Sequence, residues 1–230
     1  MKLIIARHLI PCTGGRAQVT ETETGILIEN GLIRRVDRLE AFEAERRGGK
    51  VEIIDAGDNY VLPGLIDAHL HLSFSSSAQP LDQLYGDDEA TVLLRMVRAA
   101  QMELRSGVTT VRDSGSKGMS ILQLRDFIRR GELEGPDILA AGMPLTITGG
   151  HCSFCGLECD SREEAVKAVR LLCKQGVDYI KVMVSGGNMT PGSDSLIDQY
   201  DLDTLKAIVY EAHQRGKKVS GHVHSVIGVE

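Results

Sequence analysis

Residues 60–72, YVLPGLIDAHLHL, decide how the rest of this chain is interpreted. The apolar run from Val61 to Ile66 is typical of a strand that is buried on both faces. The strand ends at His69 and His71, and because side chains alternate along a strand, these two point the same way. Two neutral imidazoles side by side could begin a divalent-metal site. The alternative is that two polar side chains mark the place where a strand reaches solvent, and the short motif alone leaves both interpretations open.

The composition excludes several classes of protein. The chain has 230 residues, of which 42% are hydrophobic and 25% charged, so it can form a sizeable globular core. Its net charge of −6 and its lack of Trp argue against a nucleic-acid partner. No apolar stretch has the length of a membrane span, and the run before Arg7 is too short for a signal peptide. Five cysteines without an export signal predict free thiols and a cytoplasmic location.

Residues 1–59 are predicted to form a small β-rich domain. Its apolar or alternating stretches are LIIARHLI (3–10), GILIENGLIRRV (25–36) and KVEIIDAG (50–57). Asn30 and Gly31 indicate a tight hairpin, because both residues accept positive φ. The charged segment 41–49 is expected to be a loop or a turn of helix. A piece of this size needs a partner to complete a core.

From residue 60 onward, strands are predicted to alternate with helices. We expect strands at 60–72, 107–113, 136–142, 176–184 and 217–224, and helices at 87–106, 119–130, 161–176 and 201–215. This alternation indicates βαβ units and a parallel sheet. The similar joints SGVTTVR (106–112) and QGVDYIK (175–181) suggest a repeated unit, as in a (β/α) barrel. In such barrels the reactive groups lie at the C-terminal strand ends.

Lys181 is a second candidate, because it lies inside the apolar strand 177–184. A lysine in a buried strand must lose its charge or find a counter-ion. One interpretation pairs it with a carboxylate of a neighbouring strand, such as Asp113. The other is a neutral amine that reacts with carbon dioxide to give an anionic carbamate, whose two oxygens could bridge two metal ions. His222 and His224 repeat the His-x-His pattern at the end of the fifth strand.

Taken together, these segments resemble the metal-dependent amidohydrolase superfamily, within its imidazolonepropionase-like and prolidase-like (Xaa-Pro dipeptidase-type) branch. The matching pieces are VLPGLIDAHLHL (61–72), GVTTVRDSG (107–115), ITGGHC (147–152), DYIKVMVSGG (178–187) and VSGHVH (219–224). They occur in the order found in the family. The resemblance implies an α/β fold, a (β/α)8 TIM-type barrel of which residues 60–230 hold about five strands. Residues 1–59 would be the N-terminal part of the small β-sandwich domain that accompanies this barrel.

The resemblance also implies a metal centre. His69 and His71 would bind the more buried metal, and His222 would bind the second one. Lys181 would be the carbamylated ligand that bridges the two. We expect two divalent ions, preferably Zn²⁺, in each complete active site.

By the same resemblance, the expected function is hydrolysis of an amide-type C–N bond by a hydroxide that bridges the metals. The substrate would be a dipeptide, an N-acyl amino acid or a cyclic amide, and we expect a homo-oligomer. His151, in the Gly-Gly-His loop after the third strand, would act in catalysis or contact the substrate, and His224 is a weaker candidate for that role. The alternative is a non-catalytic scaffold that kept the barrel, although a scaffold has no reason to keep Lys181.

Two further ligands of the family do not occur in this sequence. They are a histidine after the sixth strand and an aspartate after the eighth, which also serves as general base. We therefore expect the sequence to be the N-terminal part of a longer enzyme and not to be active by itself.

The remaining cysteines need a separate interpretation. The run His151-Cys152-x-x-Cys155-x-x-x-Cys159 could suggest a zinc or iron–sulfur site. It lacks a second pair of ligands at a suitable spacing, so we expect no separate metal centre there. Cys173 is expected on the core face of its helix.

Overall fold

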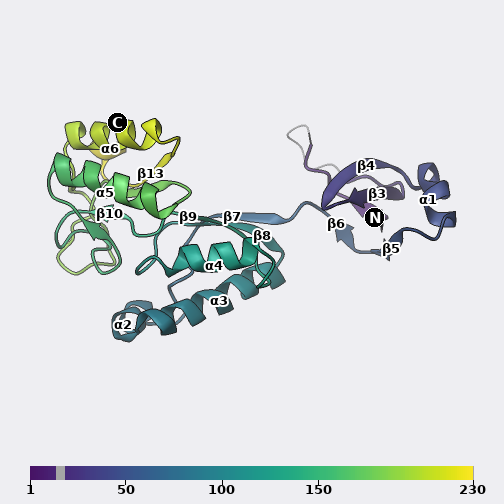
Figure 1. Cartoon of the computed structure of the whole chain (residues 1–230), viewed down its shortest axis with the longest axis horizontal. Coiled ribbons are helices and arrows are strands. Elements are labelled where there is room, and N and C mark those ends of the chain that lie inside the picture. Colours follow the sequence, from purple (N-terminus) through teal and green to yellow (C-terminus); the bar gives the residue numbers. More distant parts are fainter. Residues whose placement is uncertain (14–18, 230) are drawn as a thin grey trace. The chain divides into compact units, whose positions relative to one another are not determined.

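Two compact units make up the chain (Figure 1). The computed structural model describes residues 1–13 and 19–229, and its internal contacts divide the chain into Met1–Gly64 and Leu65–Glu230. The boundary between residues 59 and 60, together with the domain assignments attached to it, stays a prediction.

The first unit is built on a four-stranded sheet in the order β4-β3-β1-β5. The strands are β1 (Lys2–Ala6), β3 (Thr24–Glu29), β4 (Leu32–Arg38) and β5 (Glu52–Asp55), and β2 (His8–Leu9) pairs separately with β6 (Tyr60–Val61). The predicted hairpin is confirmed, since Asn30 (φ 51°) and Gly31 (φ 77°) join the antiparallel strands β3 and β4. The charged segment that follows forms a 3-10 turn, Leu39–Phe42, and the short helix α1, Glu43–Arg47.

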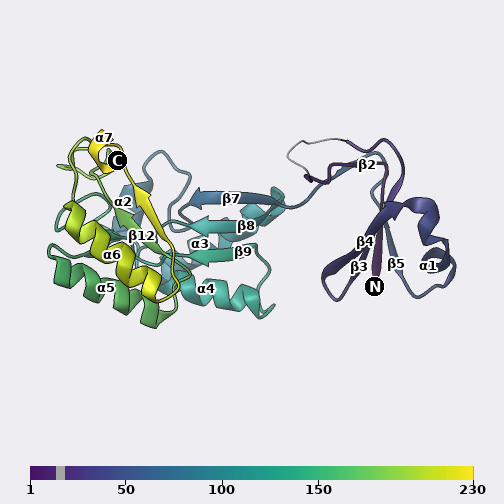
Figure 2. The same cartoon turned by 90° about the horizontal axis from the view of Figure 1, so that it is seen from above.

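Strands and helices alternate through the second unit (Figure 2). In chain order they are β7 (Leu65–Leu70), α2 (Pro80–Gly86), α3 (Glu89–Arg105), β8 (Val108–Asp113), α4 (Ser120–Arg129), β9 (Asp137–Ala140), β10 (Leu145–Thr146), β11 (Leu157–Glu158), α5 (Arg162–Gln175), β12 (Ile180–Met183), α6 (Leu202–Gln214), β13 (Val219–His222) and α7 (Val226–Val229). One sheet has the order β7-β8-β9 and the other β11-β10-β12-β13, and every pairing in both is parallel. The predicted βαβ arrangement is therefore confirmed.

The helix ends follow from local chemistry. Ser161 accepts a hydrogen bond from the Glu164 backbone at the start of α5, and the Glu164 side chain returns one to the Ser161 backbone, so the predicted capping box is present. Gly176 ends the same helix at φ 90°, a conformation that glycine adopts readily. Within residues 1–13 and 19–229, no helix combines the length and the apolar character needed to cross a membrane.

Strands β12 and β7 of the second unit differ in burial. All four residues of β12 are buried, as the sequence predicted for the strand that carries Lys181. The prediction for β7 is wrong: Leu65 is 50% exposed and Ile66 is 69% exposed. The reason is position, because β7 is an edge strand that pairs with β8 alone in the described chain. A run of apolar residues does not reveal whether a second strand covers it.

Candidate active site

Lys181 and His222 lie on the same face of one sheet. Strands β12 and β13 run parallel, with Lys181 opposite Ser220 and Met183 opposite His222. Because every second side chain of a strand points the same way, Lys181, Met183 and His222 share a face. His222 is the last residue of β13, so this face leads to the C-terminal strand ends where the sequence predicted the chemistry.

The side chain of Lys181 is the most unusual group of this face. It is only 1% exposed, and burial lowers the pKa of its amine to about 8. Among the described residues it makes no ion pair with a carboxylate. Asp113, the counter-ion considered from the sequence, accepts hydrogen bonds from the backbone of Leu72 at 2.8 Å and from Ser116 at 3.1 Å. The structure thus rules out the Lys181–Asp113 ion pair, because Asp113 serves to join the loops after β7 and β8.

His69 and His71 form the first histidine group, at the end of β7. Their ring centroids are 5.6 Å apart. Nδ1 of His71 lies 2.8 Å from the carbonyl oxygen of Gly115, and since a carbonyl only accepts, Nδ1 carries the proton. This leaves Nε2 of His71 with a free lone pair, the state of a metal-binding histidine. His69 is exposed, and partial burial together with the charge of Lys181 lowers its pKa, which favours the neutral ring.

The second histidine group consists of His151, His222 and His224. The ring of His222 lies 4.4 Å from that of His151 and 4.7 Å from that of His224, measured between centroids. Burial, with the charges of the other two histidines, lowers the pKa of His222 to about 4. Nε2 of His222 and Nδ1 of His151 are buried, and neither has a hydrogen-bond partner among the residues that the structure describes. A neutral ring with a buried, unpaired nitrogen is suited to binding a metal or a substrate atom.

The loop that carries His151 is tied to β12 by Gln199. The Gln199 amide accepts from the His151 backbone N–H at 2.5 Å and donates to the Met183 carbonyl at 2.9 Å. Thr146 donates to the His151 carbonyl at 2.8 Å. A Cβ on Gly187 would lie 2.5 Å from the imidazole Cε1 of His151, so only glycine leaves room for this ring. Sequence reasoning missed Gln199, which lies 48 residues from His151 and carries no motif of its own.

The cysteines of this loop are buried and reduced. Cys152 and Cys155 are neighbours in one buried cluster, and their interaction lowers the pKa of Cys152 and raises that of Cys155. Cys159 lies 3.2 Å from the hydroxyl of Tyr200, and burial raises the pKa of its thiol. Cys173 packs against the main core, as predicted.

The residues present fit a metal centre as donors. His71 and His222 each offer a free imidazole nitrogen, and the amine of Lys181 has a pKa close to neutrality. In the described part of the chain, however, no three or more His, Cys, Asp or Glu side chains are grouped so that they could hold a metal ion. Burial lowers the pKa of both His69 and His222, and the charge of Lys181 adds to the shift of each. That the two groups share one metal centre stays a prediction.

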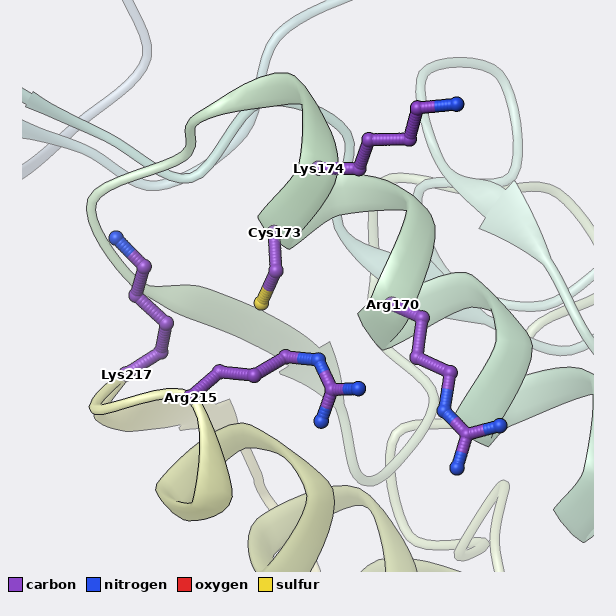
Figure 3. A pocket seen from close by; sticks show the side chains of 5 residues that line it. All are labelled: Arg170, Cys173, Lys174, Arg215 and Lys217. Carbon is purple, nitrogen blue, oxygen red and sulfur yellow. The ribbon is translucent and has the colours of Figure 1, made fainter.

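A separate surface pocket of about 430 Å³ contains none of the candidate residues (Figure 3). Its lining residues are Arg170, Cys173, Lys174, Arg215 and Lys217. Arg170 and Arg215 both pair with Glu211, at 2.6 Å and 2.5 Å. Cations are common near the last turns of helices, where they offset the carbonyl ends, so the helix ends explain this cluster.

Residues 60–230 match the model of the amidohydrolase family. The chain belongs to this family. It is 28% identical over 267 residues to the ochratoxinase of Aspergillus niger, an alignment that covers 97% of this chain and 54% of that protein. The chain therefore spans about half the length of the curated relatives that it matches.

Solved structures agree with the family assignment. The fold of this amidohydrolase is similar to that of another amidohydrolase (TM-score 0.85, 29% identity) and to that of a Xaa-Pro dipeptidase with methionine bound in its active site (TM-score 0.83, 29% identity). Each comparison covers 99% of this chain and 57% of the other. The resemblance and the α/β barrel fold predicted from the sequence are confirmed. The strands of this chain form an open part of that barrel.

Proposed function

We propose that this amidohydrolase acts as a metal-dependent hydrolase of an amide-type C–N bond. The substrate class is a dipeptide, an N-acyl amino acid or a cyclic amide. The observation that carries the proposal is Lys181, which is buried without a carboxylate partner in the described residues and shares a sheet face with His222. The similarity to a Xaa-Pro dipeptidase supports the dipeptide as one of these substrates.

His69, His71, Lys181 and His222 are the residues that would hold the metal. Imidazole nitrogens favour Zn²⁺ among the common divalent ions, so we propose two Zn²⁺ per complete active site. When bound, such metals provide a nucleophilic water at neutral pH and polarise the carbonyl group of a substrate.

Lys181 would act as a carbamate. Its neutral amine attacks carbon dioxide, an N–C bond forms, and the nitrogen releases one proton. The lowered pKa favours this step, because only the neutral amine is a nucleophile. The anionic product offsets the charge of bound cations, whereas a protonated lysine would repel them.

His151 would position the substrate. Its ring is fixed between Gly187 and His222, and its unpaired Nδ1 can form a hydrogen bond to a polar group of the substrate. His224 is the alternative for this role, although its side chain is exposed. Both histidines lie beside the sheet face that carries Lys181.

The test combines metal binding with hydrolysis. Calorimetric titration with Zn²⁺ should show binding that His71→Ala and His222→Ala weaken strongly, while His213→Ala, on the exposed side of α6, should bind as the wild type does. The same preparations are then assayed with a panel of dipeptides, N-acyl amino acids and cyclic amides. If the metal-loaded protein containing all residues of the site cleaves none of these classes, the proposal is wrong and the non-catalytic scaffold is supported.

We further propose a homo-oligomer in the cytoplasm. In this chain taken by itself, the exposed apolar residues Leu65 and Ile66 lie on a strand edge that further barrel strands would cover, and such an edge favours association. Light scattering should show particles larger than the 25.0 kDa chain. A monomer that binds no dye for apolar surfaces would contradict this.

The free cysteines are compatible with a reducing compartment.

A further inference from the structure

Cys152 and Cys155 lie in the loop that follows His151 directly. Both are free thiols, 3% and 4% exposed, and both pack on Met183 of β12. The backbone N–H of Cys155 donates to the carbonyl of Cys152 at 3.0 Å, which closes a tight turn. In such a turn the first and fourth Cα atoms lie within about 7 Å, close to the separation that a disulfide spans.

The backbone of Cys152 is unusual for a residue with a side chain. Its φ is 57°, in the left-handed region that glycine prefers. Its N–H donates to the Thr190 hydroxyl at 2.9 Å, which holds this conformation. The side chains of Cys152 and Cys155 belong to one small buried cluster with Met183, so the two thiols are close neighbours. A strained backbone that presents one sulfur to another suggests a function for the pair.

We propose that Cys152 and Cys155 form a reversible disulfide, which changes the position of His151 and thereby regulates the active site. The regulatory part rests on the proposed function, whereas the formation of the disulfide does not. Hydrogen peroxide or another small hydroperoxide is the oxidant. In a reducing compartment the pair remains as thiols until such an oxidant appears.

The chemistry balances without any further reactant. The Cys152 thiolate attacks one oxygen of hydrogen peroxide, the O–O bond breaks, and the leaving hydroxide takes up a proton to become water. Cys152 is now a sulfenic acid. The sulfur of Cys155 attacks the sulfur of Cys152, the S–O bond breaks, and the departing hydroxide leaves as water with the proton of Cys155. Two thiols and one peroxide thus give one disulfide and two waters, and a dithiol reductant restores both thiols.

The effect on His151 follows from the backbone. Forming the bond draws the two sulfurs to about 2.05 Å and tightens the turn that starts at Cys152. His151 is the preceding residue, and both of its backbone polar groups are bonded, to Gln199 and to Thr146. Tightening the turn therefore strains these two bonds and shifts the imidazole against Gly187, where no free space remains.

The other cysteines have different surroundings. Cys159 faces the Tyr200 hydroxyl, and Cys173 lies on α5 against another part of the core. Cys159→Ser is therefore the matched control, since it removes a buried thiol of the same loop without touching the pair. Cys155→Ser removes the partner and leaves Cys152 in place.

The first test is chemical. The protein is treated with one equivalent of hydrogen peroxide, free thiols are blocked with N-ethylmaleimide, and the chain is digested with chymotrypsin. Cleavage after Phe154 and Leu157 places each of the three cysteines of the loop on its own fragment. We expect the Cys152 and Cys155 fragments to be linked, in the wild type and in Cys159→Ser, and to separate in dithiothreitol. A linkage to Cys159, or oxidation of Cys152 without any linkage, would overturn the proposal.

The second test follows His151 itself. In protein with ¹³C-labelled histidine, the ring signal of His151 is assigned by its loss in His151→Gln. Oxidation should shift this signal in the wild type and in Cys159→Ser but not in Cys155→Ser, and an unshifted signal overturns the regulatory part. Where hydrolysis is measurable, oxidation should reduce it about tenfold or more, and unchanged hydrolysis would also refute regulation. If the disulfide forms and the His151 signal shifts, but the reduced protein hydrolyses none of the substrates, only the proposed function is refuted.

Discussion

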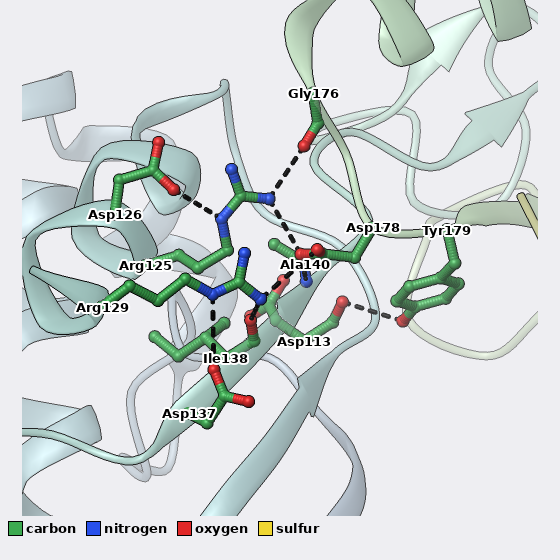
Figure 4. A network of polar contacts seen from close by, with 10 residues as sticks. All are labelled: Asp113, Arg125, Asp126, Arg129, Asp137, Ile138, Ala140, Gly176, Asp178 and Tyr179. Atoms are coloured by element: carbon green, nitrogen blue, oxygen red, sulfur yellow. Dashed lines mark hydrogen bonds and ion pairs between the residues drawn. The ribbon is translucent and has the colours of Figure 1, made fainter.

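Two buried polar clusters of the second unit differ in whether their charges are paired. Around Asp178 every group has a partner (Figure 4). Arg125, only 6% exposed, donates to Asp178 at 2.8 Å and to the Gly176 carbonyl at 2.8 Å. Asp178 also accepts from the backbone of Ala140 at 2.8 Å. Around Lys181, by contrast, His151 and His222 have buried nitrogens without partners.

The contrast distinguishes polar groups that stabilise the fold by pairing with one another from polar groups that are free to bind a ligand. The Asp178 cluster joins α4 and β9 to the residues before β12, and its pairing offsets the cost of burying charge. The Lys181 cluster bears a similar cost with nothing in the described chain to offset it. Buried titratable groups without partners are concentrated at functional sites.

Replacing Lys181 should have the largest effect, and on activity alone. In the metal-loaded protein with a complete site, Lys181→Ala should reduce kcat/KM by about a thousandfold or more, since both the bridging ligand and its charge are lost. The free energy of unfolding should stay the same or rise, because a buried amine without a counter-ion is removed. Steady-state kinetics and urea denaturation measure the two quantities.

Lys181→Met is the matched variant, because it keeps most of the side-chain volume. A short-chain carboxylate added to Lys181→Ala should restore part of the activity. Near-normal turnover with two bound metals in Lys181→Ala would show that this lysine does not bridge them.

Asp178→Ala should give the opposite result. It removes one of the two carboxylates bonded to the buried guanidinium of Arg125, while Asp126 remains at 2.8 Å. We expect the free energy of unfolding to fall by about 2 kcal/mol, the value of a hydrogen bond to a charged group. Asp137→Ala is the control, since that side chain is 58% exposed and pairs with Arg129 at 3.4 Å. The control should change stability by less than about 0.5 kcal/mol. Equal losses in both variants would remove the distinction between the clusters.

His222 should make stability depend on pH. Its pKa is about 4 in the folded chain and 6.5 without the fold, so between these values only the unfolded chain is protonated. The contribution of His222 to the free energy of unfolding should therefore fall as the pH drops from 6.5 to 4, and stay level outside this window. Because the ring is not fully buried, we expect about 1–2 kcal/mol. Urea denaturation at pH 7 and pH 5 should show a smaller difference for His222→Asn, and an unchanged one for His213→Asn.

Tyr179→Phe should have the smallest effect. The Tyr179 hydroxyl donates to the Asp113 carbonyl at 2.8 Å (Figure 4). Tyr179 itself lies between Asp178 and Lys181 in the sequence. Its loss should lower the free energy of unfolding by about 1 kcal/mol, the usual net value of one hydrogen bond. Tyr210→Phe, with an exposed ring, should have no measurable effect. A loss above about 3 kcal/mol would mean that Tyr179 belongs to the paired network.

The sequence predicted the features that depend on nearby residues. The capping box of Ser161 and Glu164 and the hairpin at Asn30 and Gly31 are set by local hydrogen bonds and by backbone conformations, so their residue types suffice. The placement of Lys181 in a buried strand follows from an apolar run. The family segments, read in order, predicted the barrel.

Features that depend on distant partners could not be predicted. Gln199 supports His151 across 48 residues, and nothing in its own segment marks it. From the sequence, Asp113 was a possible counter-ion for Lys181. In the structure its carboxylate instead accepts a hydrogen bond from the backbone of Leu72, in the loop after β7. The exposure of Ile66 depends on which strands flank β7, and an apolar run carries no such information.

The close approach of the Gly187 backbone to the His151 ring limits which positions of this amidohydrolase can be varied in engineering. A methyl group on Gly187 would overlap the His151 ring, and one on Gly186 would overlap the carbonyl oxygen of Asp194. Saturation libraries that include these two glycines would consist mostly of misfolded members. Diversity is better placed at positions without such contacts, such as Tyr85, whose side chain is 59% exposed.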